Sequence, residues 1–108
     1  MQIYDYATAG GKNVIMDYIM KLSKKECLEI LDIRNEIECT GLDAFLKLDT
    51  RQLRGKLWEI KASQTRIMYV IIDQNGVAFL HICKKQKGKA EKQEIQKALN
   101  RAKAEGLL

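Results

Sequence analysis

Residues 57–83 read LWEIKASQTRIMYVIIDQNGVAFLHIC. Three runs in this stretch, residues 57–61, 65–72 and 77–83, are rich in β-branched and aromatic side chains, which is typical of strands. The segment Asp73–Gly76 joins the last two runs. Its Asn-Gly pair is the strongest short-range hairpin signal, because such a turn needs positive φ. The stretch therefore predicts three antiparallel strands.

The positive charge of the chain is concentrated in the residues that follow these strands in the sequence, beginning with Lys84–Lys89. Residues 1–83 hold eleven basic and eleven acidic side chains, whereas residues 84–108 hold eight basic and three acidic ones. The formal net charge of +5 therefore lies in the last 25 residues. A local excess of cations behind a rigid sheet suits a polyanion such as nucleic acid. A solvated lysine face on a helix has the same composition, so charge alone leaves both readings open.

Length and composition favour one globular domain over residues 1–108, since 46% of the side chains are hydrophobic. No apolar run approaches the roughly 18 residues of a membrane span, and no basic leader precedes an apolar block. We expect a cytoplasmic protein with no membrane contact. The chain has three cysteines, one histidine and no Cys-x-x-Cys pair, so we expect reduced thiols, no metal site and no cofactor.

The remaining elements follow from periodicity and capping signals. Gln2–Tyr6 alternates like a short strand, and Lys12–Leu22 has apolar residues at helical spacing. Ser23–Glu26 has the form of a capping box, which starts a second helix that ends at Gly41. A last helix is expected over residues 90–104.

Residues 42–56 read as a connection whose Phe45, Leu46 and Leu48 should fill the core. The order strand, two helices, antiparallel strands, helix predicts an α+β fold. We expect a small antiparallel sheet with an N-terminal helical hairpin packed on it and a C-terminal helix, the helices being grouped on one side.

Alternation sorts the side chains of the strands between the two faces of the sheet. Arg66 should share a face with Met68, so it is a charge at the start of an apolar face, either at the surface or aimed into a cleft. Parity places His81 with Phe79 and Cys83. Core positions are expected for the strand aromatics Trp58 and Tyr69.

Three motifs in this region carry a resemblance to a known family: LWEIK at 57–61, RIMY at 66–69 and LHICKKQ at 80–86. In order and spacing they resemble the phage-derived HigB toxins of the RelE/ParE superfamily of toxin–antitoxin toxins. The start of the first helix, GKNVI at 11–15, fits as well. The last helix supplies the Ile, Ala and Arg of the pattern at Ile95, Ala98 and Arg101.

The resemblance implies a RelE-like fold and a toxin that cleaves messenger RNA on the ribosome. In this superfamily the 2′-hydroxyl of the substrate attacks the adjacent phosphodiester without a metal ion. Leu57 and Glu59 stand where RelE has lysines, and no tyrosine follows Tyr69, so a RelE catalytic set does not transfer whole. The positions of the family pattern that this sequence retains are Arg66 and the pair Lys84–Lys85.

We therefore expect Arg66 and Lys85 on the reacting phosphate, with Lys84 beside them. His81 is the one imidazole and is either a general acid or base or a structural residue. Glu59 is either a base or positions Arg66 through an ion pair. Backbone contacts to RNA are expected from Lys61, at the end of the first of the three strands, and from Lys87, Lys89 and Lys92 in the C-terminal segment.

The implied partners are the ribosome, messenger RNA and a cognate antitoxin, which in this branch is usually a helix-turn-helix protein. Two other readings remain. ParE-like relatives poison DNA gyrase through protein contacts. The third reading is a non-catalytic nucleic-acid-binding module or a degenerate toxin. It is supported by Ile82 and Cys83, which stand where the family has Gly-Phe.

Overall fold

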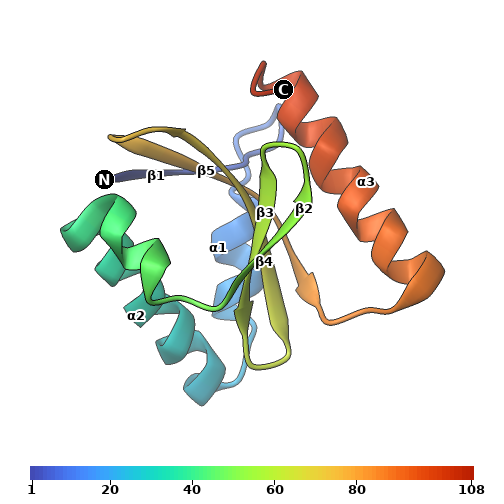
Figure 1. Ribbon diagram of the computed structural model, residues 1–108. Coiled ribbons are helices and arrows are strands. Elements are labelled where there is room, and N and C mark those ends of the chain that lie inside the picture. Colours follow the sequence, from blue (N-terminus) through green and yellow to red (C-terminus); the bar gives the residue numbers. More distant parts are fainter.

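The computed structural model describes residues 1–108 and contains one five-stranded sheet in the order β1-β5-β4-β3-β2 (Figure 1). β1 is parallel to β5 and the other neighbours are antiparallel, so the α+β prediction is confirmed with a mixed sheet. The elements are β1 (Gln2–Asp5), α1 (Val14–Met20), α2 (Lys24–Thr40), the 3₁₀ helix η1 (Gly41–Leu46), β2 (Thr50–Arg54), β3 (Leu57–Ala62), β4 (Thr65–Asp73), β5 (Gly76–Lys84) and α3 (Gly88–Ala104).

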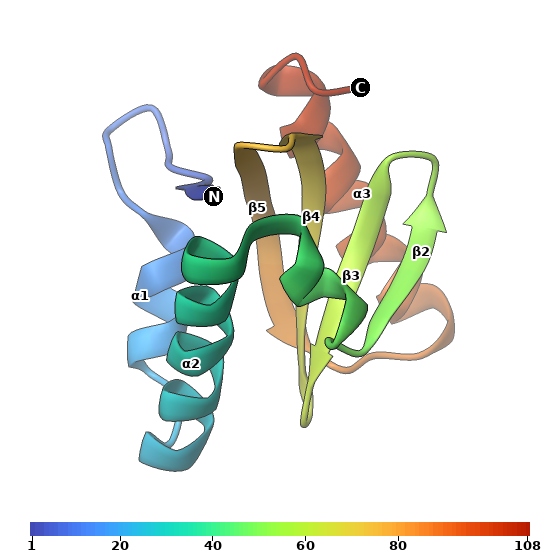
Figure 2. The same cartoon turned by 60° about the vertical axis from the view of Figure 1, so that its left-hand side comes forward.

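Helices cover both faces of the sheet. In Figure 2, α1 and α2 lie on one side of β4 and β5, and α3 lies on the other. The central strand β4 explains this arrangement, because Ile67 and Tyr69 are buried toward α1 and α2 while Met68 and Val70 are buried toward α3. The expectation that the helices group on one side is therefore wrong. A strand that is apolar on both faces needs a covering layer on each.

A β-bulge at Leu80 changes the faces of β5. His81 pairs with Met68, but Phe79 pairs with the next residue of β4, Tyr69, so Leu80 is an extra residue in β5. Leu80 and His81 consequently both lie on the α3 side, whereas Phe79 belongs to the other core. The parity that placed His81 with Phe79 is wrong, because a bulge reverses the alternation beyond it.

The β4–β5 turn exists where the sequence predicts it, but for a different reason. Asp73 pairs with Gly76, so the two turn residues are Gln74 and Asn75, and neither has positive φ. The Asp73 carboxylate accepts a hydrogen bond from the Asn75 N–H at 2.7 Å, which closes the turn. Gly76 is needed for space, because a Cβ there would lie 3.1 Å from the ring of Tyr4.

Capping signals place the helices accurately. Ser23 is the N-cap of α2, and its Oγ accepts from the Glu26 N–H at 3.3 Å. Gly41, with φ of 74°, is the C-cap of α2, as predicted. α1 is shorter than expected, and α3 begins two residues earlier than Ala90. None of the helices combines the length and apolar character that a membrane crossing requires.

The segment expected as a connection over residues 42–56 contains η1 and the edge strand β2. Phe45 does pack on the sheet, with its ring 5.0 Å from that of Tyr69, which is buried as predicted. Leu46 does not fill the core, since it is 84% exposed, and Trp58 is 37% exposed on the same side. Both core assignments are wrong because this face of β3 extends beyond the helices.

Replacing the N-cap of α2 tests the local stability of the hairpin of helices. Ser23→Ala should lower the free energy of unfolding by about 1 kcal/mol, because the backbone N–H of Glu26 loses its hydrogen-bond acceptor. Urea denaturation measures the change. Gln93→Ala on the exposed side of α3 is the control, and an equal effect of both variants would contradict the assigned cap.

Candidate nucleic-acid interface

Strand register places three cations, two in strands and one directly after β5, on the α3 face at one end of the sheet. Lys61 of β3 pairs with Arg66 of β4, and Arg66 pairs with Cys83 of β5. The Lys85 N–H donates to the carbonyl of Gln64 at 2.7 Å, so the β4–β5 pairing continues past the end of β5. Alternation then places Lys85 on the face of Cys83. We call Lys61, Arg66 and Lys85 the cationic cluster.

The cationic cluster has no acidic partner. None of its three side chains has a carboxylate within 4.0 Å. Arg66 donates from Nη1 to the carbonyls of Ser63 at 2.9 Å and Thr65 at 3.1 Å, which holds its guanidinium over the β3–β4 turn. A positioned guanidinium with free N–H groups beside two lysines is suited to a phosphate. The register thus places Arg66 and Lys85 on the same face of the sheet, and their role at a phosphate stays a prediction.

Lys84 lies on the opposite face and is not part of the cationic cluster. Its Nζ is 3.1 Å from Oε2 of Glu26 on α2. That ion pair lowers the pKa of the Glu26 carboxyl below its ordinary value. Adjacent strand residues point to opposite faces, so Lys84 and Lys85 cannot act on one phosphate from within the strand.

Glu59 pairs with Arg51 instead of Arg66. Glu59 is buried on the α3 face, and Arg51 Nε lies 2.8 Å from its Oε2, in an ion pair without hydrogen-bond geometry. The same guanidinium donates from Nη2 to Glu91 of α3 at 3.0 Å. The expected Glu59–Arg66 pair is therefore absent. Arg51 ties β2 to the first turn of α3 and leaves Arg66 without a carboxylate.

His81 is 7% exposed and both of its ring nitrogens have protein partners. Arg101 of α3 donates from Nη1 to Nδ1 at 3.2 Å, and also to the Leu80 carbonyl at 2.9 Å. Because a guanidinium only donates, Nδ1 accepts, and the ring proton lies on Nε2, which is bonded to Glu94 Oε2. Burial lowers the pKa of His81, so the ring is neutral near pH 7. This imidazole network fits the structural reading of His81.

The imidazole network also brings together side chains that bind metals. His81, Cys83 and Glu94 have potential ligand atoms within 4.8 Å of one another. Burial raises the pKa of the Cys83 thiol to about 12, which disfavours the thiolate that a metal would need. Arg101 adds a positive charge against His81. These groups therefore favour a hydrogen-bonded network over a metal centre.

The sequence analysis did not identify Glu94 as a candidate site residue. A helical stripe would have identified it, since Glu94, Ala98 and Arg101 are spaced i, i+4 and i+7 on the face that packs against β5. Two charged residues in an otherwise apolar stripe are the signal. Arg51 gave no such signal, because its strand was not predicted.

The basic residues after β5 surround the start of α3. Lys87 is the N-cap residue of α3, and no side chain caps the first N–H groups of that helix. Lys89 and Lys92 are exposed on its first turns. Free N–H groups and lysines together favour an anion at this end of the helix.

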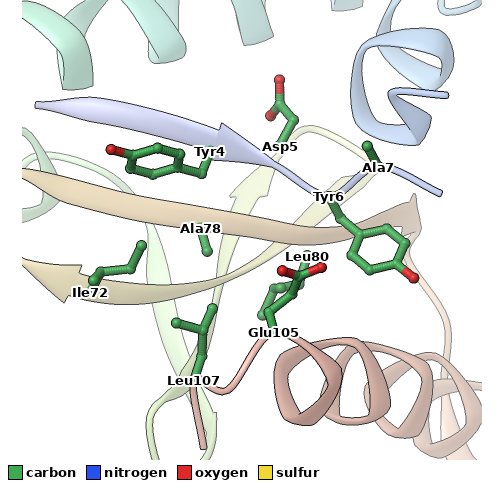
Figure 3. Close-up of a pocket in the computed structure, with 9 residues that line it drawn as sticks. All are labelled: Tyr4, Asp5, Tyr6, Ala7, Ile72, Ala78, Leu80, Glu105 and Leu107. Carbon is green, nitrogen blue, oxygen red and sulfur yellow. The ribbon is translucent and has the colours of Figure 1, made fainter. Parts of the chain in front are cut away.

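An apolar pocket lies at the other end of α3 (Figure 3). It has a volume of about 400 Å³, and Tyr4, Ile72 and Leu107 are among the residues that form its walls. No lysine or arginine lines it. This pocket therefore offers no positive charge to a polyanion, in contrast to the cationic cluster.

Comparison with protein families assigns the chain to a family. The family model for Gp49-like phage-derived proteins (DUF891) matches residues 17–103, which is most of the chain. The chain therefore belongs to the Gp49-like family, a toxin-like family of the RelE/HigB type. A search of curated proteins finds no match.

The imidazole network predicts a pH dependence of stability. The folded-state pKa of His81 is below its ordinary value of 6.5, so protonation favours the unfolded chain and stability falls as pH drops below about 6.5. Burial by itself raises the pKa of Glu94, but the hydrogen bonds from His81 and Cys83 and the charges of His81 and Lys97 together bring that pKa below its ordinary value, which adds a loss of stability in the same direction at lower pH. Wild type should lose up to about 1.4 kcal/mol per pH unit just below pH 6.5.

Urea denaturation at pH 8 to 5 measures this loss. The His81→Gln variant keeps an amide that can donate to Glu94 but does not titrate in this range, so its stability should vary less between pH 6.5 and 5. Parallel pH curves for the two proteins would contradict a neutral buried His81.

Proposed function

We propose that this protein is a HigB-like toxin of a type II toxin–antitoxin system that cleaves messenger RNA on the ribosome. Membership of the Gp49-like family supports the toxin class. The observation that carries the ribonuclease activity is the cationic cluster, because three cations without carboxylate partners share one sheet face. A phosphodiester would supply the missing negative charge.

The cationic cluster is proposed to act on the reacting phosphate. Attack by the 2′-hydroxyl places additional negative charge on the non-bridging oxygens as the pentavalent phosphorane forms. Arg66 offers a planar pair of N–H donors for two of these oxygens, while Lys61 and Lys85 add positive charge on either side. Because the strands hold the three residues, little reorganisation is needed during the reaction.

Proton transfer is assigned to Glu94. Its side chain is 26% exposed, and no lysine or arginine lies within 4.0 Å of it, in contrast to Glu59 and Glu91. As an anion it can accept the proton of the 2′-hydroxyl, and it can return that proton to the 5′-oxygen, which leaves as the P–O5′ bond breaks and the 2′,3′-cyclic phosphate forms. His81 then serves as a positioning residue, since its Nε2–H orients the carboxylate while Arg101 fixes the ring.

Contacts to the RNA backbone away from the reacting bond are assigned to the start of α3. Lys87, Lys89 and Lys92 are exposed there, and the uncapped N–H groups of α3 add partial positive charge. Such contacts strengthen binding without reading the base sequence. A helix-turn-helix antitoxin is the proposed inhibitor, and the cytoplasm is the proposed compartment.

Primer extension on a reporter messenger RNA tests the proposal directly. After brief induction, wild type should produce new 5′ ends within translated regions. Arg66→Ala should reduce these ends by about 10²-fold or more, because a preorganised donor to the phosphorane is lost. Arg66→Lys should retain part of the activity, since it keeps the charge but not the planar fork.

Arg54→Ala is the matched control for the Arg66 variants, because Arg54 is an exposed strand arginine without an ion pair. Its cleavage should equal that of wild type. Intact messenger RNA together with growth arrest and an SOS response would instead indicate a gyrase poison. Intact messenger RNA with normal growth would indicate a binding module or an inactive toxin.

Substituting one lysine at the start of α3 tests the backbone contacts. Lys87→Gln should weaken binding to ribosomes uniformly across codons and reduce the slope of log K against log salt by about 0.7–0.9. Lys103→Gln, in the last turn of the same helix, is the control. A change in codon preference without a change in salt slope would show that Lys87 reads sequence.

A further inference from the structure

Three exposed lysines lie in the turn between α1 and α2, outside the basic C-terminal segment. Lys21 is the C-cap of α1, and Lys24 and Lys25 are the first two residues of α2. All three are exposed, and none has a carboxylate within 4.0 Å. In the sequence they lie within a stretch without net charge, so the charge count did not identify them.

Contacts between α2 and the sheet bring this turn to the end of the molecule that holds the cationic cluster. Ser63 of the β3–β4 turn donates to Glu29 of α2 at 2.9 Å, and Lys84 of β5 is 3.1 Å from Glu26. In Figure 2 the α1–α2 turn, the β3–β4 turn and the start of α3 all lie at the lower end of the molecule. The cationic cluster is on the α3 face, whereas the α1–α2 turn is on the opposite face.

The acidic side chains of this part of α2 are already engaged. Glu26 binds Lys84 and also accepts hydrogen bonds from Ser23 and Thr65. Glu29 accepts from Ser63. Because these carboxylates point to the sheet and its turn, the neighbouring lysines face solvent without compensation. Charge of one sign that is not neutralised locally attracts a polyanion.

A hollow separates the lysines from the end of β5. Its volume is about 280 Å³, and its walls include Tyr18, Lys21, Ser23 and Lys84. The Lys84 ammonium and the Ser23 hydroxyl already contact Glu26, so the Lys21 ammonium and the Tyr18 hydroxyl are the donors that this concave surface offers to a ligand. Hydroxyl and ammonium donors are the groups that proteins use to contact the nucleic-acid backbone.

We propose that Lys21, Lys24 and Lys25 form a second RNA-binding surface, so that the protein contacts two separate backbone segments of a folded RNA. The reacting strand lies on the cationic cluster, and a second strand lies on the α1–α2 turn, with the β3–β4 turn between them. The two surfaces lie on opposite faces of the sheet, so a single strand that contacted both would have to turn around the end of the β3–β4 hairpin, whereas two strands of a folded RNA can each follow one face. This inference rests on the proposed RNA-cleaving function and specifies a structured RNA as the partner.

Binding to two RNA probes at several salt concentrations tests the proposal. The probes are a stem-loop RNA of about 16 base pairs and a single-stranded RNA of about 4 nucleotides, which is too short to contact both surfaces. The Lys21→Gln/Lys24→Gln/Lys25→Gln variant should bind the stem-loop at least about tenfold more weakly, with a salt slope smaller by about 2. Its affinity for the single strand should stay within about twofold of wild type, because the cationic cluster is intact.

The control is the Arg54→Gln/Lys56→Gln/Lys103→Gln variant, which loses the same three charges. Arg54 and Lys56 flank the β2–β3 turn and Lys103 lies in the last turn of α3, at the upper end of the molecule in Figure 2. Equal losses of affinity for the stem-loop in the two variants would overturn the proposal, because the affinity would then depend only on the net charge of the protein. Equal losses on both probes, or no binding of the stem-loop by wild type, would overturn it as well.

Primer extension with the same proteins separates this inference from the proposed function. If wild type does not cleave messenger RNA but the stem-loop difference persists, the ribonuclease function fails and the second RNA surface stands. If wild type cleaves and the two triple variants bind the stem-loop equally, the second surface fails and the ribonuclease function stands. Thermal unfolding of each variant confirms that the fold is retained.

Discussion

The pairing of β4 with β5 is the contact on which the rest of the structure depends. β4 is the central strand, and its residues from Thr65 to Val70 alternate between two buried faces apart from the partly exposed Arg66. Burial of apolar surface on both faces stabilises the helix layers on either side, at roughly 25 cal/mol per Å². The extra residue Leu80 in β5 then aligns His81 with Met68 and Cys83 with Arg66. The same pairing that closes the core therefore also sets the position of the polar residues beneath α3.

The charged side chains beneath α3 divide into satisfied and unsatisfied groups. Arg51 links Glu59 to Glu91, and Arg101 holds His81 against Glu94. Buried charges need such partners, because desolvation without them is costly. The cationic cluster at the end of the sheet has none. The structure thus separates a network that holds α3 in place from a set of cations that is available to a phosphate.

Much of the fold follows from local signals, and the failures have specific physical causes. The three strands, the Ser23 cap and the Gly41 cap depend on residues close in sequence, so propensity and capping identify them. β2 was overlooked because an edge strand of five residues carries little apolar periodicity. Leu46 and Trp58 were assigned to the core because composition does not show where a helix layer stops. The predicted site residues do not all share one face: Arg66 and Lys85 do by register, whereas Lys84 pairs with Glu26 on the opposite face and Glu59 pairs with Arg51.

The sequence by itself determined the element types, the concentration of positive charge after β5 and the family to which the chain belongs. These properties depend on residue identity and short-range spacing. Only the tertiary structure decided which faces the residues occupy, because one bulge at Leu80 reverses the alternation and no local pattern reveals it. Contacts between distant segments also decided that Lys84 pairs with Glu26 and that Arg51 pairs with Glu91. For the same reason the lysines of the α1–α2 turn, more than forty residues from β5 in the chain, lie beside its end.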